Sequence, residues 1–306
     1  MMKTLIRCLV VIFACCTVLA FGTSRADAAV DVVASTPELA SIAKYVGGSK
    51  VTVYSIAKPD QDYHLIEPRP SDVSRIAKAD LVVRVGLDLD LWFDALLNAA
   101  ANPKVRRGAA GYVDASRGVD RLEVPKGKVT GASGDIHIYG NPHYYYDPQN
   151  AKIIARNICE GLARVSARDR DYFEDNYKRF VDELEQHISK WQQRLKPYKG
   201  KPVVTYHRSA SYFIRRFGLR YFGQLEPKPG IPPSPSHISQ LIKHMKEENV
   251  KALVVESIYP KRFPDLVARE VGIKYQVVPY SVGSMGTKTY IDLIDAWVER
   301  FAKALE

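Results

Sequence analysis

The chain is poor in cysteine. Only four of its 306 residues are cysteines, and three of them, Cys8, Cys15 and Cys16, lie within the first 28 residues. Removal of that segment would leave Cys159 alone, and a single cysteine cannot form an internal disulfide. Cys159 falls among the apolar positions of a predicted helix, which indicates a buried structural thiol rather than a reactive one.

The chain also lacks an N-terminal apolar run long enough to cross a membrane. The stretch Leu9–Phe21 is shorter than the roughly 20 residues that a spanning helix needs. It follows two basic residues and precedes the small-residue motif Ala26-Asp27-Ala28, which are the parts of a secretory signal peptide. We predict cleavage that leaves a mature chain beginning at Ala29, and an uncleaved anchor is the alternative. Because Cys15 and Cys16 precede the cleavage motif, we expect a soluble exported protein rather than a lipoprotein.

No stretch of the chain carries a strong excess of one charge. The formal net charge is +10, and cleavage before Ala29 removes three basic residues and one acidic residue, which leaves +8. Basic and acidic residues alternate, as in Lys246-Glu247-Glu248 and Arg168-Asp169-Arg170-Asp171. We interpret this pattern as a solvated surface rather than a nucleic-acid or membrane patch, and we expect no nucleic-acid partner.

Strand and helix patterns alternate through the first half of the mature chain. Val30–Ala34, Val51–Ile56 and Leu81–Val85 have the composition of strands, and the last is an unbroken apolar run typical of a strand buried on both faces. Thr36-Pro37 is a helix start signal, and residues 103–140 predict a long loop with one or two short strands. This alternation predicts an α/β fold with a largely parallel sheet.

A single long helix is predicted over residues 168–196. Its apolar residues follow one another at steps of three or four with no intervening Gly or Pro: Phe173, Tyr177, Phe180, Leu184, Ile188, Trp191 and Leu195. At about 1.5 Å per residue, such a helix is roughly 40 Å long. A coiled coil has the same spacing, but one isolated segment between two α/β halves is better explained as a rigid connector.

The α/β pattern resumes after this helix. Strands are predicted at Pro202–Tyr206, Ala252–Val255 and Tyr275–Val278. The predicted organisation is therefore a signal peptide, an α/β lobe, a connecting helix and a second α/β lobe, over residues 1–28, 29–167, 168–196 and 197–306.

Three histidines lie at boundaries of predicted elements. His64 and His207 follow predicted strands, and His143 precedes a predicted helix. Ligands collect at the carboxyl ends of strands in open α/β sheets, and Glu256 also ends a predicted strand. Three imidazoles and one carboxylate suit zinc, although other first-row metals accept the same donors. A lone loop histidine is more often a surface residue, so this hypothesis requires the histidines to meet in the fold.

Four sequence blocks resemble those of a known family. They are 62–73 (DYHLIEPRPSDV), 140–148 (GNPHYYYDP), 203–207 (VVTYH) with Tyr212-Phe213, and 254–256 (VVE) with 277–283 (VVPYSVG). In this order they resemble the zinc/manganese solute-binding proteins of bacterial ABC importers, the ZnuA/TroA-like family, over nearly all of the mature chain. The first block departs from the family pattern, because Tyr63 stands where proline is usual.

The resemblance implies two α/β lobes joined by a long helix, with a transported metal ion between them and no catalysis. It implies His64, His143 and His207 as metal ligands. Many members place an aspartate where this chain has Tyr280, so we expect Glu256 or a water molecule as the fourth ligand.

The resemblance also favours zinc as the cargo, because manganese-selective members often have a harder carboxylate ligand at the position of His207. Zinc-binding members often carry a His-rich loop before the second ligand, whereas residues 115–140 contain only His137. This difference argues against a metal-collecting loop but not against the site. Our hypothesis is a monomeric periplasmic receptor that binds zinc, with manganese less favoured, and delivers it to an ABC permease in the inner membrane.

Three other functions are compatible with the residues. An exported zinc hydrolase would use the same histidines with Glu256 as general base, although the chain has no HExxH motif. A surface adhesin on the same fold and a receptor for an organic metal chelate are the others. Zinc-dependent turnover, binding to host or matrix proteins, and preference for a chelate over free metal would distinguish them.

Overall fold

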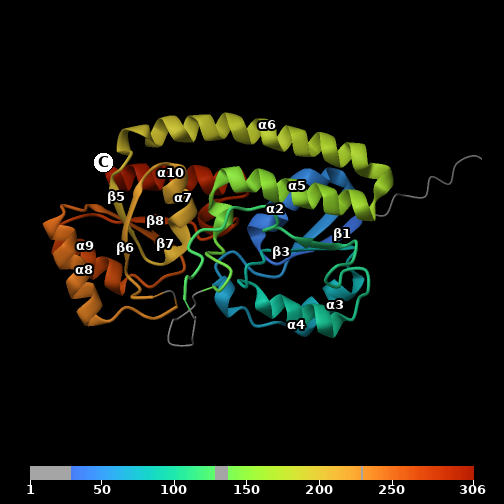
Figure 1. The fold of residues 1–306 in the computed structure, drawn as a ribbon, viewed down its shortest axis with the longest axis horizontal. Coiled ribbons are helices and arrows are strands. Elements are labelled where there is room, and N and C mark those ends of the chain that lie inside the picture. Colours follow the sequence, from blue (N-terminus) through green and yellow to red (C-terminus); the bar gives the residue numbers. More distant parts are fainter. Residues whose placement is uncertain (1–28, 128–136, 229) are drawn as a thin grey trace, which may run out of the picture.

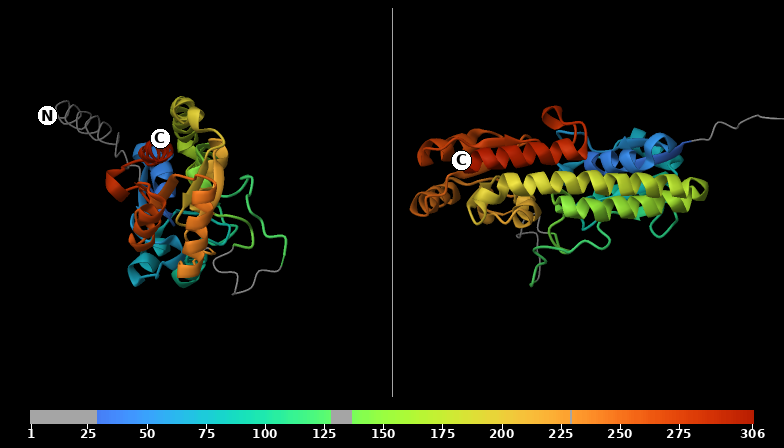
Figure 2. Two further views of the ribbon diagram at one scale, coloured as in Figure 1. Left: turned by 90° about the vertical axis from the view of Figure 1, so that its left-hand side faces the viewer. Right: turned by 90° about the horizontal axis from the view of Figure 1, so that it is seen from above.

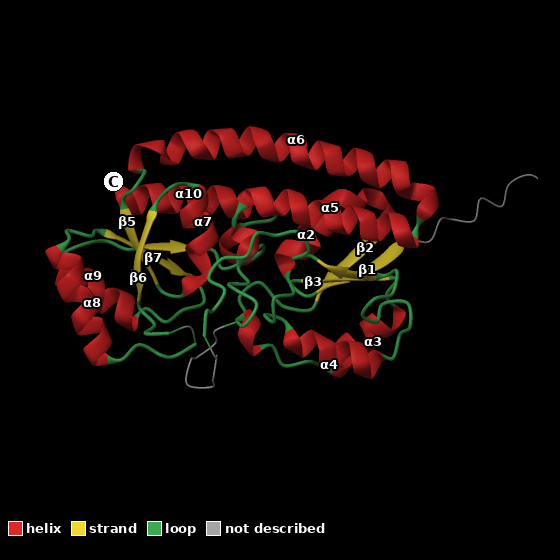
Figure 3. Ribbon diagram, in the orientation of Figure 1, coloured by secondary structure: helices red, strands yellow, loops and turns green. Residues whose placement is uncertain are grey.

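Two four-stranded parallel sheets form the framework of the protein (Figures 1 and 3). The computed structural model describes residues 29–127, 137–228 and 230–306, so the predicted signal peptide lies outside the described residues. The first four strands of these residues make one sheet and the last four make the other, and every pairing within the sheets is parallel. The prediction of a two-lobed α/β fold is confirmed.

The first sheet has the strand order β2-β1-β3-β4. Its strands are β1 (Val30–Ala34), β2 (Val51–Ser55), β3 (Leu81–Arg84) and β4 (Tyr112–Asp114). Its helices are α2 (Pro37–Gly47), α3 (Pro70–Lys78), α4 (Leu91–Ala100) and α5 (Pro148–Val165). Helices α2 and α5 cover one face and α3 and α4 the other (Figure 1), so β3 is buried along its whole length, as its apolar run predicts.

The second sheet has the corresponding order, β6-β5-β7-β8. Its strands are β5 (Pro202–Thr205), β6 (Arg220–Gln224), β7 (Ala252–Glu256) and β8 (Gln276–Val278). Its helices are α7 (Ser211–Arg216), α8 (Pro235–Glu247), α9 (Arg262–Val271) and α10 (Tyr290–Leu305). Strand β6 was not predicted. It lies at the edge of the sheet and none of its residues is fully buried, so it has neither an apolar run nor a clear alternation.

Helix α6 (Arg170–Leu195) is 26 residues long and lies over both halves of the molecule. Figure 2 shows it beside α5 at one end and beside α10 at the other, and it also contacts α2. Its buried face matches the predicted apolar spacing except at one position. Asn176 is buried instead of Tyr177, because its side-chain amide donates to the Val46 carbonyl (2.9 Å) at the end of α2.

The two halves share one hydrophobic core. A continuous cluster of buried residues includes strands of both sheets, α6 and α10, and a smaller cluster lies between the second sheet and helices α8 and α9. Tyr146, which precedes α5, stacks on Trp297 of α10 with ring centroids 4.0 Å apart. The halves are therefore packed directly against each other and are not connected by α6 alone.

Two loops also join the halves. The hydroxyls of Ser281 and Ser284 donate to the Pro59 carbonyl at 2.6 and 2.9 Å. Gly283 has a φ of 98°, and a Cβ atom there would lie 2.5 Å from Cγ of Pro59. Glycine is thus needed both for the left-handed backbone and for the close approach.

Among the helices of the described ranges, none is long and apolar enough to cross a membrane.

The shared core makes α6 a sensitive position for stability. Leu184 of α6 is fully buried, so Leu184→Ala should lower the free energy of unfolding by about 2–5 kcal/mol. We expect a single unfolding transition in denaturant, because both halves depend on the same core. The exposed Lys190→Ala on the same helix is the matched control and should change stability by less than about 0.5 kcal/mol. Two separated transitions in the parent protein would contradict the shared core.

Candidate metal centre

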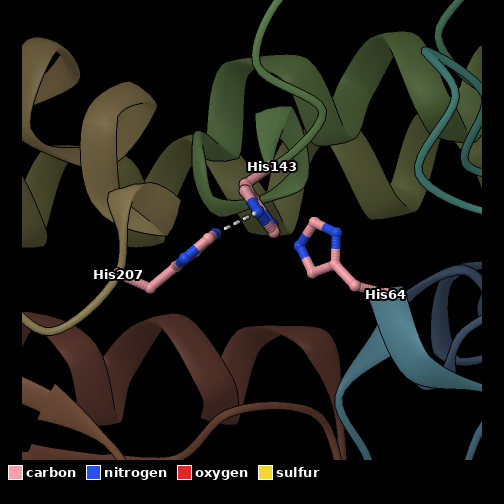
Figure 4. Close-up of side chains that lie close together, drawn as sticks. All are labelled: His64, His143 and His207. Atoms are coloured by element: carbon pink, nitrogen blue, oxygen red, sulfur yellow. Dashed lines mark hydrogen bonds between the residues drawn. The ribbon is translucent and has the colours of Figure 1, made fainter. Parts of the chain in front are cut away.

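Three histidine side chains from distant parts of the chain meet inside the protein (Figure 4). The candidate ligand atoms of His64, His143 and His207 all lie within 4.8 Å of one another. Nε2 of His143 is 3.2 Å from Nε2 of His207, and His64 lies 5.4 Å from each of them between ring centroids. Two nitrogens bound to one tetrahedral zinc ion at the usual Zn–N distance are about 3.3 Å apart. The arrangement therefore fits one small metal ion.

His64 lies on a short 3-10 turn, Tyr63–Leu65, in the loop between β2 and α3. The Asp62 carboxylate caps this turn by accepting a hydrogen bond from the His64 amide at 3.0 Å. Nε2 of His64 is buried and has no hydrogen-bond partner among the described residues. A buried nitrogen of this kind is costly unless it binds a ligand, so the ring is suited to donate its lone pair to a metal.

Tyr63 holds the backbone next to His64. Its hydroxyl donates to both oxygens of the Glu38 carboxylate, at 3.0 and 2.9 Å. Its amide donates to the Tyr280 hydroxyl (3.1 Å), and its carbonyl accepts from the Trp92 indole (2.9 Å). Glu38 is fully buried, and burial raises its pKa to about 7 despite these hydrogen bonds. The residue that replaces the family's usual proline is thus a buried anchor with three partners.

His143 is held by residues on either side of it. Its amide donates to the Asn141 side-chain oxygen (2.9 Å), and its Nδ1 lies 3.0 Å from the Tyr145 hydroxyl. The Asn141 side-chain amide donates to the Arg208 carbonyl (2.8 Å), which directly follows His207. The loop that carries the second histidine is therefore bonded to the loop that carries the third.

His207 follows β5 and is positioned by a carboxylate. Its Nδ1 lies 2.7 Å from Oε2 of Glu226, and both side chains are buried. A carboxylate bonded to one ring nitrogen orients the other nitrogen toward a metal and makes it a stronger donor. The Thr205 hydroxyl donates to the His207 carbonyl at 2.6 Å, which fixes the backbone at the strand end.

The three imidazoles have different protonation preferences. Burial, followed by the charges of the neighbouring histidines, holds the pKa of His64 and of His143 well below the ordinary value. Burial also lowers the pKa of His207, but the hydrogen bond and charge of Glu226 outweigh it and leave that pKa raised. Two rings are therefore ready to bind a metal, whereas His207 must first release a proton at acidic pH.

Glu256 lies outside the three-histidine group. It ends β7 and is buried, and one of its oxygens accepts a hydrogen bond from the Ser209 hydroxyl. Its other oxygen is buried and has no hydrogen-bond partner in the part of the chain that the structure describes, and burial raises the pKa of Glu256 to about 7. Tyr280 stands where many family members have an aspartate ligand. Its hydroxyl accepts a hydrogen bond from the Tyr63 amide. The structure thus brings together three of the four predicted ligands.

Sequence reasoning missed Glu226. Glu226 comes two positions after the end of strand β6, which was not predicted, and 19 residues after His207, whose ring it contacts. Correct assignment of β6 would have placed a carboxylate at a strand end beside the site, which is the available signal.

A cavity of about 270 Å³ adjoins the histidines. Its lining includes His143 and His207 as well as His137, Asn141 and Arg208. His143 and His207 are thus buried but border a space through which an ion can reach them, and His64 is half-buried beside them.

Known proteins share this sequence pattern and fold. The family model described as "Zinc-uptake complex component A periplasmic" matches residues 32–304. The manganese ABC transporter substrate-binding lipoprotein PsaA of Streptococcus mitis is 26% identical over 99% of this chain and 99% of its own. A crystal structure of ZnuA aligns with a TM-score of 0.77 at 25% identity, covering 91% of this chain and 100% of that one. A mutant structure of the laminin-binding adhesin Lmb from Streptococcus agalactiae also aligns with a TM-score of 0.77. It is 27% identical, and the alignment covers 90% of this chain and 99% of that one.

The Glu226–His207 pair predicts a pH-dependent effect on metal binding. Glu226→Gln should weaken zinc binding by about 10–100-fold at pH 8, because His207 loses its orienting carboxylate. The loss should be smaller at pH 6. There the raised pKa of His207 makes protons compete with zinc in the parent, and the variant removes the cause of that competition.

Competition with a chromophoric chelator at both pH values measures these affinities. Glu248→Gln is the control, because Glu248 is exposed and forms an ion pair with exposed Arg220 at 3.1 Å. An equal loss at pH 6 and pH 8 would contradict the assigned role of Glu226.

Proposed function

The chain belongs to the zinc-uptake complex component A family, the substrate-binding proteins of metal ABC importers, and we propose that it captures zinc and delivers it to an ABC permease. Proteins of this family are metal receptors and not enzymes, so the hydrolase alternative is wrong. In our proposal a monomer binds the ion between two lobes, residues 29–167 and 197–306, through His64, His143 and His207.

One observation carries the proposal of zinc as cargo, namely that the clustered donors are all imidazole nitrogens. No carboxylate belongs to the ligand group formed by the residues that the structure describes. Imidazole suits zinc, whereas manganese(II) is better matched by harder oxygen donors. The relative from Streptococcus mitis that is named for manganese is 26% identical to this chain, so we base the proposed cargo on the ligand set of this chain rather than on that name.

Release of the ion follows from the same packing. The shared core and the contacts of Pro59 with Ser281 and Ser284 oppose a wide hinge opening between the halves. We propose that local movement of the ligand loops releases the ion to the permease. His64 and His143 lie in loop segments between the α-helices and strands. Such loops are the parts of a fold that move most readily.

A second candidate function is adhesion. The similarity to the laminin-binding adhesin Lmb favours it as an additional activity, because that protein has this fold over nearly the whole chain. Saturable binding of the purified protein to immobilised laminin would support adhesion. Absence of binding with both the metal-stripped and the zinc-loaded protein would reject it.

The zinc proposal predicts a strong dependence on His207. By isothermal titration, the metal-stripped protein should bind one zinc ion with submicromolar affinity, and His207→Ala should weaken it by more than about 100-fold. Manganese should bind more weakly than zinc to the parent. His244→Ala is the control, because His244 is exposed on α8, and it should leave both affinities unchanged. Micromolar or weaker zinc binding in both the parent and His207→Ala would reject the proposal.

We also propose that the protein works as a soluble periplasmic receptor after removal of its signal peptide. The streptococcal relatives are named lipoproteins, whereas Cys15 and Cys16 of this chain precede the predicted cleavage motif. The intact mass of protein recovered from the periplasm should correspond to a chain beginning at Ala29. A mass that includes an acylated N-terminal cysteine would show a lipid anchor instead.

A further inference from the structure

A fourth histidine lies beside the three clustered ones. The ring centroid of His137 is 5.1 Å from that of His64, whereas His143 and His207 are each 5.4 Å from it. His137 also lines the same cavity as His143 and His207. It is thus in ring contact with one of the proposed ligands and faces the space beside the other two.

The orientation of His137 is that of a metal-binding imidazole. Its Nδ1 lies 2.8 Å from Oδ1 of Asp88, so a neutral ring donates its Nδ1 proton to this carboxylate. The Nε2 atom then carries the free lone pair, and it is buried with no hydrogen-bond partner among the described residues. A carboxylate on one ring nitrogen and an unused lone pair on the other is the usual arrangement of a histidine ligand.

Asp88 is held in place for this contact. Its second oxygen accepts a hydrogen bond from the Ile138 amide (3.1 Å). The Asp88 carboxylate thus contacts both the ring of His137 and the backbone of the next residue. Leu87 and Asp88 both have left-handed backbone conformations, with φ of 49° and 57°. Such strain in consecutive non-glycine residues is retained mainly where a site requires it.

We propose that His137 is the fourth ligand of the bound metal ion and completes a site of four neutral imidazoles. This inference rests on the proposed function. The candidate ligand atoms of His137 lie outside the 4.8 Å group, so loading includes a shift of its ring toward His64. His137 lies outside the helices and strands, and no regular element holds its backbone against that shift.

The surrounding charges agree with this ligand set. A divalent ion bound by four neutral imidazoles keeps its two positive charges. Asp88 and Glu226 each bond to the ring nitrogen that faces away from the ion and together place two negative charges next to the ligand rings. These two negative charges offset the cost of burying the doubly charged ion without a carboxylate ligand. A site of imidazoles alone strengthens the preference for zinc over manganese.

The test uses cobalt(II) as a spectroscopic substitute for zinc in the full-length mature protein. Cobalt(II) absorption in the visible region depends on the number and kind of ligands. His137→Ala and His137→Gln should both change the position and intensity of the parent's bands, and free imidazole should restore the parent spectrum in His137→Ala. Both variants should also bind zinc about 10–100-fold more weakly than the parent.

Controls separate a ligand from a structural role. Asp88→Asn should weaken zinc binding while keeping the four-nitrogen spectrum, and His244→Ala should change neither. Spectra of both His137 variants identical to that of the parent would overturn the inference, as would a spectral change produced by Glu256→Gln instead. A parent that binds neither zinc nor cobalt would reject the proposed function itself, which is a distinguishable result.

Discussion

The burial of apolar side chains in one core through both halves is the constraint on which the site depends. His64 belongs to the half with the first sheet and His207 to the half with the second, so their separation is fixed only while the halves stay packed. Helix α6 and the stacking of Tyr146 on Trp297 supply that packing, and the loop contacts at Pro59 add hydrogen bonds. The proposed metal site is therefore largely assembled before an ion arrives, which reduces the ordering that binding has to impose.

Burial also sets the proton chemistry of the site. The same exclusion of water that assembles the rings keeps His64 and His143 neutral, whereas Glu226 favours the protonated form of His207. His64 and His143 thus offer lone pairs to a cation with little competition from protons, whereas His207 has to release a proton before it binds at acidic pH. Catalytic zinc sites keep an open position for an activated water, and a fourth imidazole from His137 would instead close the coordination sphere, as a receptor requires.

Much of this architecture could be predicted from local patterns. The long helix followed from the spacing of residues such as Leu184 and Ile188, and His64, His143 and His207 stood out at the boundaries of predicted elements. What the sequence could not reveal were contacts between distant side chains. The pairing of His137 with Asp88 spans 49 residues, and no local pattern encodes it. Glu226 was hidden because edge strand β6 lacks the apolar periodicity on which strand prediction relies.

The matching strand orders, β2-β1-β3-β4 and β6-β5-β7-β8, have an evolutionary consequence. When the two sheets are matched strand by strand, β5 corresponds to β1. His207 then corresponds to the residues just after β1, where Ser35 and Thr36 stand, whereas His64 follows β2. Duplication of an ancestral half would reproduce the scaffold but not the ligands. The two halves are thus equivalent in strand order and unequal in chemistry, so the repeat that relates the two sheets does not extend to the histidines.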